Sequence, residues 1–176
     1  MSGHNKWSKI KRKKEAGDAN KSKVFGKLAR LIAVESKKDD GNINAPGLRA
    51  AIEKARGENM PSDNIDRAIK KGACENQSLV ETLLYEAYGP AGTAMMIEVL
   101  TANRNKAAAE IKHLLAKNGA SLATQGAASW AFTKTDDGWK PNQTIDISDE
   151  DSEKLGSLIA ELEDSDDVQG VYTNAS

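Results

Sequence analysis

The sequence of 176 residues has few of the side chains that form disulfides or bind metals, since it contains one cysteine and two histidines. The single Cys74 cannot form an internal disulfide, and no Cys/His cluster has the spacing of a zinc site. No apolar run is long enough to cross a bilayer, and the basic start lacks the apolar segment of a secretory signal. We therefore expect a cytoplasmic protein with no membrane association and no metal.

Catalytic patterns are also scarce. His4 and His113 lie far apart in the sequence, and no serine stands in a nucleophile-elbow motif. The segment Gly89–Gly92, GPAG, lacks the Lys-Ser/Thr of a phosphate-binding loop. His113 borders the apolar stripe of its expected helix, so we expect it to be partly buried and structural. The sequence thus predicts no enzyme, no catalytic residue and no cofactor.

Charge is distributed very unevenly along the chain, although the formal net charge is only −1. Residues 1–76 contain 18 lysines and arginines and 10 aspartates and glutamates, whereas residues 77–176 contain 7 and 16. A basic half followed by an acidic half indicates a polyanion-binding region joined to an acidic region. The alternative is that each set of charges only keeps its half soluble.

The basic half has the period of α-helices. Its apolar residues recur every three or four positions in a helix over residues 21–38, a second from Pro46 to Gly57 and a third that follows Met60-Pro61 and ends at Gly72. Three short amphipathic helices are expected to pack as a bundle. We place this domain at residues 1–76, with a linker over residues 73–80.

The acidic half, residues 80–176, has a mixed pattern that predicts an α+β domain. Two strand-like runs flank the GPAG turn, and a helix follows that Asn103 can cap and Gly119 can end. Residues 127–134 are expected to form a strand with Ala128, Trp130 and Phe132 on one face, and residues 144–174 a strand, a helix and a strand. The order ββαβ-βαβ predicts a ferredoxin-like sandwich, with helices on one face of a mostly antiparallel sheet.

The basic residues form the candidate nucleic-acid site, because cations hold phosphates. Lys23, Lys27 and Arg30 fall on one side of the first helix. Trp7 is either an anchor for the basic start or a ring on which a base stacks. Arg104 and Lys106, at a helix N-terminus, either hold an anion or are only solvated. The candidate residues are Lys6, Trp7, Lys9, Lys11, Arg12, Lys13, Lys14, Lys21, Lys23, Lys27, Arg30, Arg49, Lys54, Arg56, Arg67, Lys70, Lys71, Arg104 and Lys106.

Several segments resemble the YebC/PmpR family over essentially the whole chain. They are GHNKWSKIKRKK near the start, NMPSDNIDRAIKKG in the third helix, YEAYGPAGT and TANRNK in the second half, and LIAELEDSDDVQGVYTN near the end. The resemblance implies a three-helix domain followed by two α/β domains, the third inserted within the second. Here SWAFTK leads through TDDGWKPNQ directly to the last strand–helix–strand, so the third domain is expected to be absent near residues 133–143.

The resemblance implies a non-enzymatic regulator of gene expression. Bacterial members are described as DNA-binding transcriptional regulators, while related members act in translation, on the ribosome. The residues themselves leave DNA and ribosomal RNA open, and the lysine-rich surface favours phosphates over base edges. A third interpretation is an adaptor whose acidic domain binds a basic protein partner.

Overall fold

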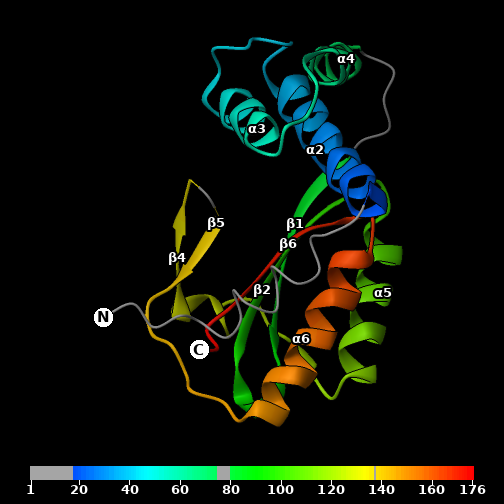
Figure 1. Cartoon of the computed structure of the whole chain (residues 1–176). Coiled ribbons are helices and arrows are strands. Elements are labelled where there is room, and N and C mark those ends of the chain that lie inside the picture. The colour runs from blue at the N-terminus through cyan, green and yellow to red at the C-terminus, as the bar shows by residue number, and fades with distance from the viewer. Residues whose placement is uncertain (1–17, 75–79, 137) are drawn as a thin grey trace. The chain divides into compact units, whose positions relative to one another are not determined.

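The computed structural model describes residues 18–74, 80–136 and 138–176, and these fall into two compact units that meet in the sequence between Val80 and Glu81. The first unit is helical and the second has both helices and strands (Figure 1). The α+β fold class predicted from the sequence is therefore confirmed. No helix in the described part of the chain combines the length and the apolar composition that crossing a membrane would need.

The helical unit is built from three amphipathic helices. They are α2 (Asp18–Lys38), α3 (Pro46–Gly57) and α4 (Ser62–Ala73). Their apolar stripes meet in one core, which includes Ile32, Leu48 and Ile65. These are the helices that the 3.6-residue period predicts.

Helices α2 and α4 approach each other closely at a glycine. A β-carbon on Gly72 would lie 2.2 Å from the carbonyl oxygen of Ala33, so only glycine allows this backbone contact. Near the contact, the buried Ser36 Oγ donates a hydrogen bond of 2.7 Å to the carbonyl oxygen of Ile69. The hydroxyl is therefore satisfied inside the core.

The second unit contains a four-stranded antiparallel sheet in the order β3-β1-β2-β6 and a separate β4-β5 hairpin. Its elements are β1 (Glu81–Tyr88), η1 (Pro90–Gly92), β2 (Ala94–Thr101), α5 (Arg104–Lys117), β3 (Ser121–Ala123), η2 (Ser129–Ala131), β4 (Phe132–Thr135), β5 (Gly138–Pro141), α6 (Asp149–Asp164) and β6 (Val168–Thr173).

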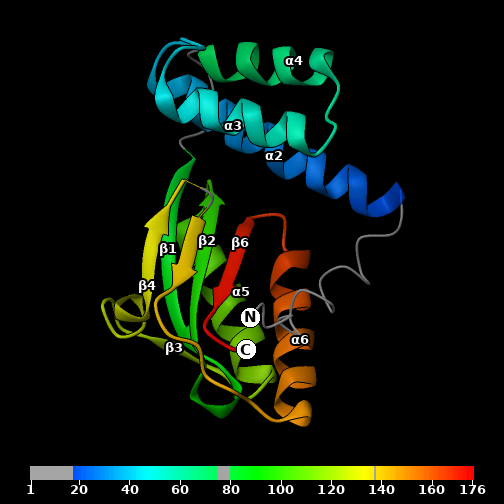
Figure 2. The ribbon, with the colours of Figure 1, turned by 60° about the vertical axis from the view of Figure 1, so that its left-hand side comes forward.

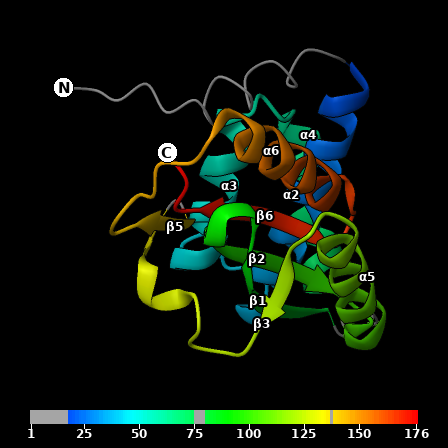
Figure 3. The same ribbon diagram turned by 90° about the horizontal axis from the view of Figure 1, so that it is seen from below.

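The two faces of this sheet are covered differently, because side chains alternate along each strand. One face, with Met95 and Ile97 of β2, packs against α5 and α6. The other face, with Met96, packs against η2 and the hairpin through Phe132 and Trp139. Figure 2 and Figure 3 show the two helices together on one side of the sheet.

The expected strand over residues 127–134 is wrong in its first half. Residues 129–131 form a 3₁₀ turn, and Trp130 is exposed while Ala128 and Phe132 are buried. The physical reason is that the buried carboxylate of Glu86 accepts the N–H groups of this loop, which are then not available to a strand ladder. The strand that pairs with β1 is instead the short β3, which precedes this loop in the sequence.

Two smaller expectations are also wrong. The segment before α6 is not a strand: Ile145 makes one isolated bridge to Ala175, and the chain then enters the helix, which Ser148 caps. His113 is exposed rather than partly buried. The predicted cap at Asn103 is confirmed, since its side chain accepts the N–H of Lys106, and Gly119 ends α5 with a φ of +70°.

Candidate nucleic-acid interface

Part of the predicted basic site lies outside the described residues, namely Lys6, Trp7, Lys9, Lys11, Arg12, Lys13 and Lys14. The other predicted residues lie on four helices, of which α2, α3 and α4 belong to the helical unit and α5 to the α+β unit. Each helix positions its cations in a different way.

On α2, three predicted cations follow a single side. Lys23, Lys27 and Arg30 are spaced i, i+4, i+7, on the side away from the buried Leu28 and Ile32. All three are half-buried, and each already takes part in an interaction within the structure. Lys21, one turn into the helix, is exposed.

Helix α4 presents the clearest group of exposed cations. Arg67, Lys70 and Lys71 are exposed, on the side opposite to the buried Ile65 and Ala68. Among the residues that the structure describes, no ion pair involves any of the three. Lysines in the last turn also stabilise a helix through its dipole, and they can still bind an anion while doing so. The group is therefore available to an anionic partner.

Helix α3 contributes cations that are less concentrated. Arg49 Nε pairs with Glu53 Oε1 at 3.3 Å, and both side chains are largely exposed. Exposed pairs of this kind contribute about 0–1 kcal/mol, so a phosphate can compete for the arginine. Lys54 and Arg56 are exposed.

In the α+β unit, Arg104 and Lys106 lie exposed at the N-terminus of α5. The Asn103 side chain already caps this helix, and Thr101 Oγ1 accepts the N–H of Asn103 while lying 2.9 Å from Asp167 Oδ2. A carboxylate therefore stands close to this helix start, and the first-turn N–H of Lys106 is already bonded, so the helix start is a poor phosphate site.

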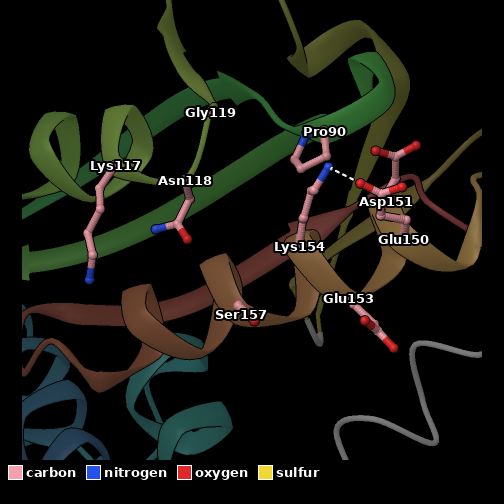
Figure 4. A pocket seen from close by; sticks show the side chains of 9 residues that line it. All are labelled: Pro90, Lys117, Asn118, Gly119, Glu150, Asp151, Glu153, Lys154 and Ser157. Carbon is pink, nitrogen blue, oxygen red and sulfur yellow. Dashed lines mark hydrogen bonds and ion pairs between the residues drawn. The ribbon is translucent and has the colours of Figure 1, made fainter.

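A hollow of about 700 Å³ lies between the end of α5, Pro90 and the first half of α6 (Figure 4). Its lysines are already engaged: Lys154 Nζ lies 2.6 Å from Glu150, and Lys117 Nζ lies 3.0 Å from Glu161 outside the lining. These contacts raise the pKa of Lys154 and lower the pKa of Glu161. The hollow therefore contains paired surface charges rather than a base beside a nucleophile.

Across residues 18–74, 80–136 and 138–176, no group of three or more histidine, cysteine, aspartate or glutamate side chains is arranged to hold a metal ion. The exposed Cys74 comes directly after α4, in the expected linker.

The sequence analysis did not predict the loop over residues 126–129, which the Glu86 side chain holds in place. The Glu86 side chain is only 5% exposed and accepts N–H groups from Gly126 at 2.7 Å, Ala128 at 2.7 Å and Ser129 at 2.8 Å. Burial by itself raises the pKa of Glu86, but these hydrogen bonds outweigh it and hold the pKa below its usual value. The sequence contains one signal for this loop. Glu86 stands within the strand-like run LLYEAY, and a buried carboxylate there requires hydrogen-bond donors from elsewhere in the chain.

Comparisons with known proteins cover nearly the whole chain. Residues 5–75 match the family described as "TACO1/YebC protein N-terminal domain", and residues 80–136 and 133–175 match "TACO1/YebC second and third domain". The second match is in two pieces, and they meet at the β4-β5 hairpin. This is the place where the sequence predicts that a domain is absent.

Relatives named "Probable transcriptional regulatory protein" align along most of their length. The protein of Desulfatibacillum aliphaticivorans is 42% identical over 237 positions, covering 99% of this chain and 96% of the relative. That of Thermotoga petrophila is 37% identical over 236 positions, covering 99% and 93%. These alignments are longer than the 176 residues of the chain, as a missing insert requires.

A solved structure shares the fold. The crystal structure of a conserved hypothetical protein from Aquifex aeolicus superimposes with a TM-score of 0.78 and is 30% identical, covering 90% of this chain and 91% of that one. The predicted resemblance is thereby confirmed at the levels of sequence and fold.

Proposed function

Because the chain belongs to the TACO1/YebC family, whose relatives are named probable transcriptional regulatory proteins, we propose that it is a non-enzymatic regulator that acts by binding nucleic acid, with DNA as the first target. The helical unit makes the contacts. The observation that carries the proposal is the exposed cationic group Arg67, Lys70 and Lys71 on α4.

The chemistry of this group favours phosphates. Lysine is a point charge that binds a phosphate without reading a base, and arginine reads a base only where its planar group reaches a base edge. The outer side of α4 bears two lysines and one arginine, and the exposed Asp63 and Asp66 lie nearer the start of the helix. We therefore expect binding with strong salt dependence and weak sequence preference.

The test is a salt series on the whole protein with a labelled DNA duplex. In the variant Arg67→Gln/Lys70→Gln/Lys71→Gln, affinity should fall and the slope of log K against log salt should become shallower by roughly 2 to 3, because each phosphate contact contributes about 0.9. Lys112→Gln is the control, since it removes one exposed lysine from α5 in the other unit. It should change neither quantity measurably.

Two results would contradict the proposal. One is a wild-type affinity for duplex that does not depend on salt. The other is an α4 variant with the slope of the wild type. Sedimentation with ribosomes across the same salt series separates a translational from a transcriptional role. Retention on ribosomes at salt concentrations that abolish duplex binding would move the target to ribosomal RNA.

A further inference from the structure

Trp130 is unusual among the apolar side chains of the protein. It is 63% exposed, more than any other large hydrophobic residue in the described part of the chain. Single exposed leucines and isoleucines are common on protein surfaces, but tryptophan has the largest side chain and is usually mostly buried. An exposed indole in a hydrogen-bonded loop indicates a contact surface.

The loop around Trp130 is held on both sides. On one side the three hydrogen bonds to Glu86 fix the backbone from Gly126 to Ser129. On the other side Asn142 donates its N–H to the Ala131 carbonyl at 2.8 Å, and its side-chain amide to the Trp130 carbonyl at 3.3 Å. The ring is thus attached to a rigid frame.

The indole itself is also oriented. Its Nε1 donates to the Ala127 carbonyl at 2.8 Å and lies 3.4 Å from the hydroxyl of Tyr88, which bonds to the same carbonyl. Because the N–H is satisfied inside the loop, the part of the ring that meets solvent is its apolar surface. Such a ring is pre-organised for stacking and loses little conformational freedom on binding.

The electrostatics of this face differ from the rest of the acidic unit. Seven of the sixteen carboxylates in residues 77–176 lie on α6, which covers the opposite face of the sheet. The segment over residues 124–144, which includes Trp130, has two lysines and two aspartates and is neutral. The Glu86 carboxylate beneath this segment is buried and hydrogen-bonded to the loop N–H groups, so it does not face solvent. One of these lysines, Lys140, is exposed on the hairpin. A polyanion can therefore approach Trp130 without facing the acidic helix.

We propose that Trp130 is a stacking site for one unpaired base of a single-stranded nucleic acid, RNA or DNA. This deepens the proposed function, on which it rests, because it gives the α+β unit a contact that selects unpaired strands while the helical unit binds phosphates. Stacking suits this position because every base presents an aromatic face and the contact requires no cation.

The test compares Trp130→Ala and Trp130→Phe with the wild type in binding a labelled oligouridylate, an oligothymidylate of the same length and a DNA duplex. Trp130→Ala should weaken binding to at least one single strand by about 5- to 100-fold, with the salt slope unchanged because no charge is removed. Trp130→Phe should lose less, and duplex binding should not change. Leu122→Ala, which trims another exposed apolar residue (39% exposed) of the same unit, is the control and should bind as wild type.

The outcomes separate the two proposals. If Trp130→Ala weakens only oligouridylate binding, the ligand is RNA, and if it weakens only oligothymidylate binding, the ligand is DNA. Unchanged affinity for both strands, beside an α4 variant with a shallower slope, overturns the stacking site alone, and the indole then fits a protein partner. An equal loss on duplex and single strands also overturns it, and a wild type that binds none of the probes removes both proposals. Circular dichroism melts of each variant identify any loss that comes from unfolding.

Discussion

The helical unit and the α+β unit use their charged residues in opposite ways. In the helical unit the exposed cations of α4 point away from the core and have no part in holding it together. In the α+β unit two glutamates hold a chain segment onto the sheet: Glu86 binds the loop before β4, and Glu98 accepts the indole N–H of Trp139 at 3.0 Å. A count of charges along the sequence does not separate exposed charges from those that hold the fold together. The exposed cations of α4 are available to a partner, whereas Glu86 and Glu98 are engaged within the α+β unit.

The largest effect is expected from Glu86→Gln. Glutamine retains one acceptor oxygen and places an amide among N–H donors, so the loop loses charge-assisted hydrogen bonds. We expect the free energy of unfolding to fall by about 3 kcal/mol, measured by urea denaturation. Glu81→Gln, at an exposed position on the same strand, is the control and should stay within about 0.5 kcal/mol of wild type. A loss as small as that of the control would contradict the structural role of the Glu86 carboxylate.

The same carboxylate gives a pH dependence. The pKa of Glu86 in the folded protein lies below the ordinary glutamate value of 4.5, so its ionised form stabilises the fold above that value. This contribution is lost as the pH falls from about 4.5 through the lowered folded pKa. The difference in stability between wild type and Glu86→Gln should therefore shrink over that range in urea titrations. A constant difference from neutral to acidic pH would show that the charge is not what stabilises the loop.

An intermediate effect is expected in the helical unit from Gly72→Ala. The added methyl group meets the Ala33 backbone, which cannot move as a flexible side chain can, so α2 and α4 must separate. We expect a loss of about 2 kcal/mol in thermal or urea unfolding. Gly26→Ala is the matched variant, because Gly26 lies inside α2 with nothing within 4 Å of the added carbon. It should stabilise by about 0.5–1 kcal/mol, and a similar change in both variants would contradict the close packing at Gly72.

The smallest stability effect is expected from Trp139→Phe. Phenylalanine keeps most of the apolar contact with the sheet but removes the donor to Glu98 Oε1. The loss should be about 1 kcal/mol. Glu98 also receives the hydroxyl of Tyr172 at 3.3 Å, so it keeps one partner. A Trp139→Phe variant as stable as wild type would mean that the hairpin is held by packing alone.

The same contrast explains what could be predicted from the sequence. The helices α2, α3 and α4 follow from local periodicity, because each buries one stripe and its boundaries have proline or glycine signals. Strands β1 and β2 follow from the two strand-like runs on either side of the GPAG turn. The loop at Trp130 could not be predicted, since its conformation depends on hydrogen bonds that its N–H groups donate to Glu86, about 40 residues earlier in the sequence.

The candidate site was predictable only as a list of cations. Spacing placed Lys23, Lys27 and Arg30 on one side of α2, and it placed Arg67, Lys70 and Lys71 outward on α4. What spacing cannot tell is which cations already have partners, because ion pairs depend on tertiary neighbours. Arg49 and its partner Glu53 are an exception, since both lie one turn apart on α3.

The central claim is that the helical unit, and not the α+β unit, binds the nucleic-acid backbone. The most direct test is the salt slope of duplex binding for two variants with equal loss of charge. One neutralises Arg67, Lys70 and Lys71 on α4, and the other neutralises Lys112, Lys117 and Lys154 on α5 and α6. We predict that the slope becomes shallower by roughly 2 to 3 in the first variant and by less than about 1 in the second. Equal changes in the two variants, or the larger change in the second, would contradict the claim.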